Sequence, residues 1–412
     1  MRTATAGRLA TWWANTSRGL PQPFWYLLAG TFVNRMGQMV TPFLALYLSG
    51  PRDFSPSVVG VVLACLGAGA FASQPVGGYL ADRIGRRATL VIGMVATAAS
   101  FMMLAVVRDL ALIAVAAALS GLAVDLYRPA VSAMIADLVA PEHRARAFAL
   151  VYWVINLGVA VAGVTGGLLA ERSFWLLFVL DAATCLAFAA LIARKVPETR
   201  PPRDPSHTAG YAQALGDRLL LGLSASTLLG AIVYMQSLVT LPLAVEADGL
   251  GPDAFGLIYA VNPIVVIVAQ VFVLRILDRI AGVRILVVSL VVMGVGFGMT
   301  AFASTVPMFA LTVVVWTLGE VGFNAVEPAL VADIAPVDLR GRYNGVVGMA
   351  YGAAALLGPL FGTRLFEKYG ENVLWAACLI ASLVSAALIA AMAPSIARRR
   401  AAMLLAPHPS QP

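Results

Sequence analysis

Charged residues are scarce in this sequence. Asp, Glu, Lys and Arg make up 12% of its 412 residues, whereas ordinary globular proteins contain about 25%. A soluble protein of this length could not cover its surface with so few charges, so the composition excludes a soluble enzyme and a disordered protein. Hydrophobic residues make up 60%, above the roughly 45–50% of globular domains, which indicates a membrane protein.

Cysteine and histidine are also scarce, with three residues of each type. The cysteines fall within apolar segments, which predicts buried small side chains and excludes a disulfide scaffold. The histidines fall in loops or tails, where none is placed to carry a proton through a membrane. We therefore expect no metal site and no cofactor. These residues are Cys65, Cys185, Cys378, His143, His207 and His408.

Catalytic and energy-coupling motifs are missing as well. A Walker A phosphate-binding loop does not occur, which excludes ATP as the energy source. A membrane enzyme should show clusters of His, Cys or nucleophile–base pairs within its apolar segments, and no such cluster occurs. We therefore expect the protein not to be an enzyme.

The apolar residues form twelve segments, each long enough for a membrane-spanning helix of about 20 residues. Most are rich in Ala, Gly, Val and Leu, which is typical of packed membrane helices. The sequence thus predicts an all-α membrane protein with twelve transmembrane helices. The predicted spans are residues 24–49, 57–80, 88–107, 110–138, 145–169, 173–193, 217–245, 254–277, 284–304, 307–334, 342–366 and 371–393.

The basic residues are distributed unevenly about these spans. When both termini are placed in the cytoplasm, 21 of the 28 Lys and Arg residues lie on the cytoplasmic side, five lie outside and two lie within spans. Cytoplasmic loops of membrane proteins carry such an excess. The net charge of +7 therefore indicates topology rather than a nucleic-acid partner. We expect a multi-pass protein of the inner (cytoplasmic) membrane with both termini in the cytoplasm, working as a monomer.

One long polar stretch divides the chain into two halves with matching motifs. Asp82-Arg83-Ile84 recurs as Asp278-Arg279-Ile280, each following the second span of its half. Repeated halves of this kind are typical of secondary transporters. The predicted organisation is an N-terminal six-helix bundle with an interfacial N-terminal segment (1–193), a cytoplasmic linker (194–216), a C-terminal six-helix bundle (217–394) and a cytoplasmic tail (395–412).

The strongest motif is GYLADRIGRR at residues 78–87, between the second and third spans. It resembles the signature loop of the major facilitator superfamily, and the likeness extends to the twelve spans, the two halves and the linker. The resemblance implies a cytoplasmic latch in which Asp82 bonds to the start of a helix in the other half. A loop that only fixes topology is the alternative. The gating residues implied in this loop are Gly78, Asp82, Arg83, Gly85, Arg86 and Arg87.

Two further features are similar to that family. Asp137 ends the fourth span, and the resemblance implies that it joins the charge network of the loop through Arg83 or Arg86. Gly163 and Gly167 belong to a face of small residues in the fifth span that resembles the antiporter motif of family exporters, with Gly163-Val164 where Gly-Pro is usual. A plain helix-end carboxylate and generic close packing of helices are the alternatives.

Several ionisable residues fall within the spans, most of them near the middle and Glu327 roughly 10 Å nearer the cytoplasm. A charge at the bilayer centre costs about 2.5–3.5 kcal/mol on insertion scales, so such residues are functional candidates. Arg35 lies in the first span, Asp125 and Arg128 in the fourth, and Glu320 and Glu327 in the tenth. The resemblance implies that the first, fourth, seventh and tenth spans line a central cavity.

The spacing of these residues defines their possible pairs. Asp125 and Arg128 are three apart and share a helix face, so they form either part of the site or a structural pair. Glu320 and Glu327 are seven apart, also on one face, and the tenth span contains no basic residue. We expect Glu320 or Glu327 to bind and release the transported proton.

Uncharged polar residues on the cavity-lining spans are candidates for contacts with the cargo. These are Asn34, Gln38, Tyr234 and Asn324. The alternative for each of them is that it holds helices together or packs in the core.

The sequence thus predicts a proton-coupled secondary transporter whose partners are protons, the lipid bilayer and a small-molecule substrate. The resemblance favours the proton-coupled multidrug antiporters, which export amphiphilic or cationic compounds. An importer or a lipid or metabolite flippase of the same fold is the alternative. A membrane sensor or scaffold is a further class, but it would not need carboxylates in mid-membrane.

Overall fold

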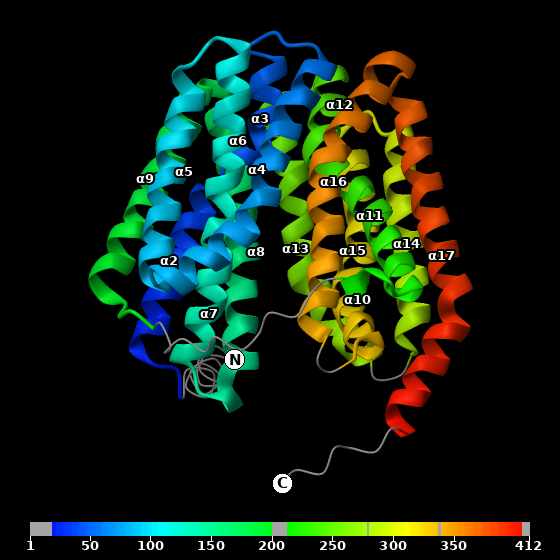
Figure 1. Ribbon diagram of the computed structural model, residues 1–412. Helices are drawn as coiled ribbons and strands as arrows, with labels where there is room; N and C mark the ends of the chain where they lie inside the picture. Colours follow the sequence, from blue (N-terminus) through cyan, green and yellow to red (C-terminus); the bar gives the residue numbers. More distant parts are fainter. Residues whose placement is uncertain (1–18, 200–211, 278–279, 337–338, 406–412) are drawn as a thin grey trace, which may run out of the picture.

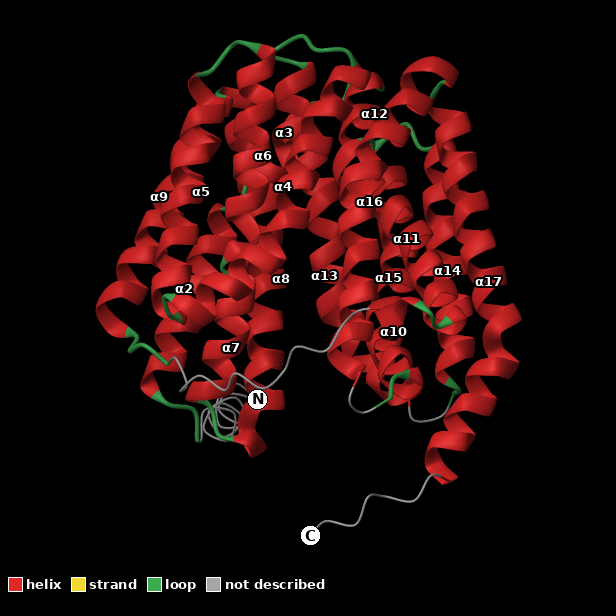
Figure 2. Cartoon of the chain, in the orientation of Figure 1, coloured by secondary structure: helices red, strands yellow, loops and turns green. Residues whose placement is uncertain are grey.

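The computed structural model describes residues 19–199, 212–277, 280–336 and 339–405. The described residues form helices joined by short loops, and none of them lies in a β-strand (Figure 2). The predicted all-α fold is therefore confirmed. The N-terminal segment 1–18 and the linker residues 200–211 lie outside the described residues.

The helices form two groups that stand side by side (Figure 1). The first half comprises α2 (Gln22–Gly37), α3 (Val40–Ser49), α4 (Pro56–Arg83), α5 (Arg86–Val106), α6 (Leu110–Leu126), α7 (Arg128–Leu138), α8 (Pro141–Arg172) and α9 (Phe174–Lys195). The second half comprises α10 (Ala212–Leu215), α11 (Arg218–Val239), α12 (Leu241–Ala247), α13 (Pro252–Leu277), α14 (Gly282–Met299), η1 (Thr300–Phe302), α15 (Val306–Ile334), α16 (Arg340–Tyr369) and α17 (Glu371–Leu405).

We call the side on which α2 begins and α17 ends the terminal face, and the other side the opposite face. Eleven helices of the described residues are long and apolar enough to cross a membrane. The predicted first span is also helical, but it is divided into α2 and α3, neither of which reaches 18 residues. Eleven of the twelve predicted spans are thus found as long apolar helices, and the first is divided between α2 and α3.

Three spans are each interrupted by a short break between two helices. The breaks at Gln38–Met39, Tyr127 and Thr240 separate α2 from α3, α6 from α7, and α11 from α12. A proline lacks the N–H that would bond to the carbonyl four residues earlier, and its ring clashes with that carbonyl. Each break is followed within four residues by a proline, namely Pro42, Pro129 and Pro242. Each proline lies in the first turn of the new helix, where an N–H has no helical partner.

The last helix runs further than the predicted last span. We expected that span to end at residue 393 and a tail to begin at 395, but α17 continues to Leu405 and contains Pro394. Ala and Arg, which dominate residues 397–402, are strong helix formers in water as well as in lipid. The change from apolar to basic residues therefore does not mark the end of the helix.

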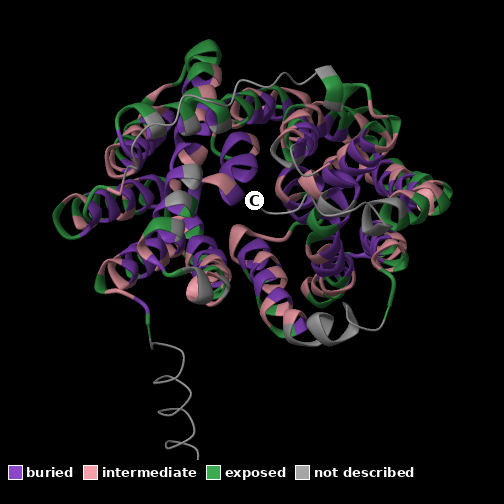
Figure 3. Ribbon diagram, turned by 60° about the horizontal axis from the view of Figure 1, so that its bottom comes forward, coloured by how far each residue is buried: buried purple, intermediate pink, exposed green. Residues whose placement is uncertain are grey.

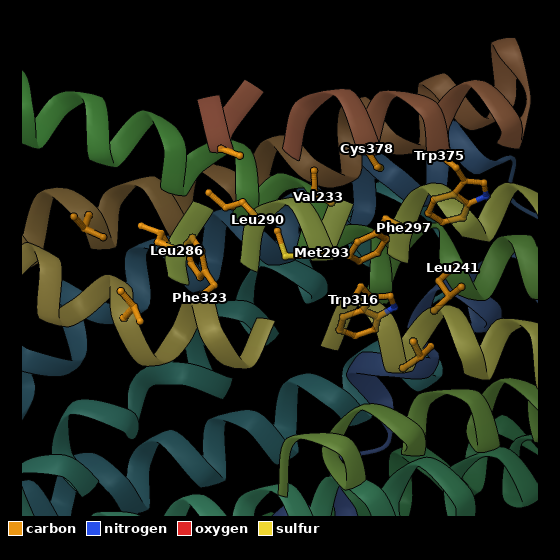
Figure 4. Packing of buried hydrophobic residues seen from close by; sticks show 14 of the residues in the cluster. Val233, Leu241, Leu286, Leu290, Met293, Phe297, Trp316, Phe323, Trp375 and Cys378 are labelled. Atoms are coloured by element: carbon orange, nitrogen blue, oxygen red, sulfur yellow. The ribbon is translucent and has the colours of Figure 1, made fainter. Parts of the chain in front are cut away.

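Apolar side chains hold each half together. In the second half, Phe297 of α14 stacks on Trp316 of α15 with ring centroids 5.2 Å apart, and on Trp375 of α17 at 6.4 Å (Figure 4). All three side chains are buried. Seen from the terminal face, buried residues lie mainly inside the two groups and exposed residues around the periphery (Figure 3). The exposed apolar periphery is the surface expected to meet lipid.

The two halves contact each other near the opposite face. Ser49, at the end of α3, donates to Glu246 Oε2 of α12 at 2.6 Å. The backbone N–H of Ser57 in α4 donates to Glu367 Oε2 of α16 at 2.6 Å. The rings of Phe43 and Phe255 pack edge to face with centroids 5.3 Å apart. These contacts close the space between the halves on this side.

At the terminal face, a polar cluster lies within the second half. Asp217, which precedes the span Arg218–Val239, caps α11 and accepts hydrogen bonds from Tyr343 and Arg399. Burial raises the pKa of the Asp217 carboxyl, but the bonds from Arg399, Tyr343 and the Leu219 N–H outweigh it and hold the pKa below the ordinary 3.8. The cluster joins the starts of α11 and α16 to the end of α17.

We expect Asp217→Asn to lower the free energy of unfolding by about 0.5–1 kcal/mol at pH 7, because a partly exposed ion pair is lost. A carboxyl with a lowered folded pKa stabilises the fold above its ordinary pKa, and this stabilisation is lost as the pH falls through the folded value. The difference between wild type and variant should thus be constant at neutral pH and shrink below pH 3.8. Thermal unfolding in detergent measures it. Arg398→Gln, which removes only a bond to Ser395, is the control, and an equal loss in both variants would contradict this role of Asp217.

Candidate functional site

The Glu320 carboxylate lies where three helices of the second half meet. Asn262 of α13 donates to Glu320 Oε2 at 2.6 Å. Asn324, one turn further along α15, donates to Oε1 at 3.5 Å. The Tyr234 hydroxyl of α11 is directed at the same carboxylate. Two of the predicted cargo contacts, Tyr234 and Asn324, therefore surround the predicted proton site.

The orientation of α15 shows which way Glu320 points. Leu311 and Leu318, seven residues apart on one face, are 55% and 49% exposed, and they form an apolar surface. Glu320 follows Leu318 by two residues, which is about 200° around the helix axis at 3.6 residues per turn. Asn324, which shares the Glu320 face, is exposed. The carboxylate and the amide thus point away from the lipid-facing side of α15.

Aromatic rings line one side of this carboxylate. Tyr234 packs edge to face on Trp316, one turn before Glu320, with ring centroids 6.0 Å apart. From the first half, Tyr152 of α8 packs on the cluster of Val266, Ala269 and Val321. The Glu320 side of α15 therefore lies near the boundary between the halves.

Glu327 occupies a more enclosed position than Glu320. Its side chain is 4% exposed, and Thr227 of α11 donates to Oε1 at 2.9 Å. Among the described residues, no Lys or Arg lies within ion-pair distance of Glu320 or Glu327. Two mid-membrane carboxylates without a described basic partner are strong candidates for proton binding, because an unpaired carboxylate in an apolar environment is most stable when protonated.

Arg35 lies in a second polar cluster, inside the first half. Its guanidinium donates to Gln38 and to the Tyr127 hydroxyl, and its side chain is 7% exposed. Asn34 donates to the Cys185 sulfur of α9 at 3.2 Å. Asn34, Arg35 and Gln38 therefore bond to groups of their own half.

The predicted pair Asp125–Arg128 is only partly described. Asp125 lies in the last turn of α6 and is partly buried. Arg128 begins α7, but its side chain lies outside the described residues, so whether the two form a pair stays a prediction.

The signature loop is anchored to the end of α9. Gly85 has a φ of +103°, which is unfavourable for other residues. Glu198 then accepts hydrogen bonds from the backbone N–H groups of Arg86 (2.8 Å) and Arg87 (3.2 Å), and so caps the start of α5. The Arg87 guanidinium donates to the Ala193 carbonyl.

Other predicted gating residues make contacts within the first half. Arg86 forms an ion pair with Asp137 at the end of α7, and Arg83 donates to the Tyr79 hydroxyl. The side chain of Asp82 and the surroundings of Gly78 lie outside the described residues. The role of this network in gating stays a prediction.

Gly163 and Gly167 lie where α8 crosses α13 of the other half. A Cβ atom on Gly163 would lie 3.0 Å from the Gly256 carbonyl oxygen, and one on Gly167 would lie 2.7 Å from the Pro252 carbonyl oxygen. A Cβ on Gly256 itself would lie 2.4 Å from the Gly163 oxygen. These glycines therefore let the two halves touch backbone to backbone.

Three residues were not predicted as site residues from the sequence: Asn262, Glu198, and Asp181, whose carboxylate accepts hydrogen bonds from the Met39 and Val40 N–H groups. Asn262 lies on the eighth span, outside the four spans that the resemblance implies line the cavity. Glu198 lies in the linker and gives no local signal of its capping role. Asp181 is an acidic residue within the predicted sixth span, so the argument that singled out Glu320 would have found it.

Comparisons with known proteins support these observations. The family model described as "Major Facilitator Superfamily" matches residues 27–279 and 223–406. A Na(+), Li(+), K(+)/H(+) antiporter of Planococcus maritimus is 24% identical, with 81% of this chain and 87% of the relative covered. The multidrug resistance protein MdtH of Cronobacter sakazakii is 25% identical, with 80% and 82% covered.

Solved structures share the fold. A crystal structure of the nucleoside transporter NupG superimposes with a TM-score of 0.79 at 16% identity, covering 90% of this chain and 100% of that one. The family match spans most of the chain and agrees with the helical architecture described above. This chain therefore belongs to the major facilitator superfamily.

Proposed function

We propose that this protein is a proton-coupled antiporter that exports small amphiphilic or cationic compounds by alternating access. In this proposal the cargo and the proton share a site around Glu320, which opens to one side of the membrane at a time. Protons enter from outside, and their binding to the carboxylate releases the cargo there. The protein works as a monomer in the inner membrane with both termini in the cytoplasm.

The surroundings of Glu320 are the observation that carries this proposal. The carboxylate is held by neutral donors, Asn262 and Asn324, and no described basic side chain neutralises it. Aromatic rings of Tyr234 and Trp316 stand beside it. A carboxylate with aromatic neighbours attracts organic cations, and a proton competes directly for the same oxygens.

The contacts between the halves support alternating access. The glycine crossing of α8 and α13 and the Ser49–Glu246 bond close the opposite face. The Arg86–Asp137 pair at the terminal face stays within one half. We propose that the signature loop, including Gly78 and Asp82, joins the halves when the terminal face closes.

The relatives favour this function. One is named as an exchanger of alkali cations for protons and another as a multidrug resistance protein. Both names fit a cation-binding carboxylate. The alternative is a proton-coupled importer or a flippase on the same fold, which would use the same carboxylate with the opposite direction of cargo movement.

Inverted membrane vesicles distinguish these functions. We expect a pH gradient that is acidic inside to drive ethidium, tetraphenylphosphonium or another compound of a cationic panel into vesicles that contain the protein, with release of protons from the lumen. Vesicles without the protein are the control. Cargo movement out of the vesicles along with protons would support the importer and reject the proposed direction.

A further inference from the structure

The break in the first span is stabilised by a buried carboxylate from another helix. Asp181 of α9 is 1% exposed. Its Oδ2 accepts hydrogen bonds from the backbone N–H groups of both Met39 and Val40, each at 3.1 Å. Val40 is the first residue of α3, where the leading N–H groups have no preceding helical carbonyl, and the Met39 N–H also donates to the Gly37 carbonyl at 2.7 Å. A single side chain of the sixth span thus accepts hydrogen bonds from two backbone N–H groups at the break.

The two segments on either side of the break have different contacts. On one side, α2 carries Arg35, which bonds within the first half. On the other side, α3 carries Phe43 and Ser49, which contact Phe255 and Glu246 of the second half. The position of α3 relative to α2 therefore affects two of the contacts that close the opposite face.

We propose that Asp181 is a positioning residue that fixes the break in the first span and thereby holds α3 in the position that closes the opposite face. It acts through an acceptor oxygen and does not carry the transported proton. Its carboxylate contacts backbone N–H groups and the Cys185 sulfur (3.8 Å), and it lies away from the Asn262–Glu320 contact of the other half.

Two engineered cysteines report on this position in the full-length purified protein in detergent. Ser49→Cys lies at the seal of the opposite face, and Asn324→Cys lies on the exposed mid-membrane face of α15. A bulky hydrophilic maleimide labels each reporter at a rate that follows its access to water. The chain without a reporter gives the background, which comes mainly from the half-buried Cys65, because Cys185 and Cys378 are buried.

We expect Asp181→Leu to raise the labelling rate of Ser49→Cys about tenfold, since it removes the side-chain acceptor of two buried backbone N–H groups. Labelling of Asn324→Cys should fall at the same time, because the cavity then closes from the terminal face. Asp181→Asn keeps an acceptor oxygen and should behave as wild type. General loosening of the fold would raise both rates together.

Several outcomes would overturn the proposal. These are unchanged labelling of both reporters in Asp181→Leu, a parallel rise of both, or equal effects of Asn and Leu. If the Leu variant is not recovered, Asp181→Ser replaces it, because its shorter hydroxyl cannot bridge both N–H groups. Ser120→Ala is the control, since Ser120 is equally buried but bonds only to its own helix. The assay needs no cargo, so it can fail or succeed independently of the proposed transport function.

Discussion

Glu320→Gln should reduce uphill, pH-driven transport to the level of empty liposomes. Glutamine keeps an oxygen that can accept the Asn262 hydrogen bond, but it cannot release a proton. The variant should therefore still let cargo equilibrate down its own gradient. Reconstituted protein with an imposed pH gradient measures uphill transport, and a cargo gradient without a pH gradient measures the downhill rate.

Glu171→Gln is the matched control, because Glu171 is an exposed carboxylate at the end of α8. Glu327→Gln and the double variant complete the series, since both tenth-span carboxylates lack a described basic partner. Full coupling in both single variants and in the double variant would show that the proton is carried elsewhere.

Gly256→Ala should lower the transport rate about tenfold or more. The added Cβ would lie 2.4 Å from the Gly163 carbonyl oxygen and 2.9 Å from Gly167 Cα, and both are backbone atoms that cannot move aside alone. Overpacking of this kind costs about 1–3 kcal/mol, and a factor of ten corresponds to about 1.4 kcal/mol. The variant should therefore populate poorly the state in which α8 and α13 touch.

The control for this substitution is Gly348→Ala, because nothing lies within 4 Å of a Cβ atom at Gly348. Transport initial rates at saturating cargo compare the two variants. Equal transport rates in Gly256→Ala and wild type would show that transport does not require α8 and α13 to approach as closely as they do in the structure.

The spans could be predicted from the sequence because each residue of a span contributes independently to its length and apolarity. Each needs only length, apolarity and the placement of Arg and Lys, and none depends on a contact with a distant residue. The breaks were harder to predict. Pro42, Pro129 and Pro242 each follow a break, but Pro263 and Pro359 lie inside continuous helices. A proline therefore permits a break, and the first one is also stabilised by the tertiary contact with Asp181.

The carboxylates of the site could be predicted from the sequence, but the residues that surround them could not. Counting along the spans selects Glu320 and Glu327, because carboxylates at that depth are costly wherever they point. Their surroundings depend on how three helices meet. The contact of Asn262 with Glu320 and that of Asn34 with Cys185 both join residues far apart in the sequence. If one helix were rotated about its axis by one residue position, either contact would be lost. The hydrophobic periodicity of a sequence does not determine the rotation of a helix to within one residue.

The central claim is that cargo and proton share the Glu320 carboxylate. It is tested most directly by counting the protons that the protein releases when cargo binds. Purified protein in a weakly buffered solution with a pH-sensitive dye is mixed with the cation that gives the highest rate in the vesicle assay. If cargo and proton share the Glu320 carboxylate, wild type should release protons on binding, and Glu320→Gln should bind the same cargo without release. Proton release of equal size from wild type and from the Glu320→Gln, Glu327→Gln double variant would contradict the account.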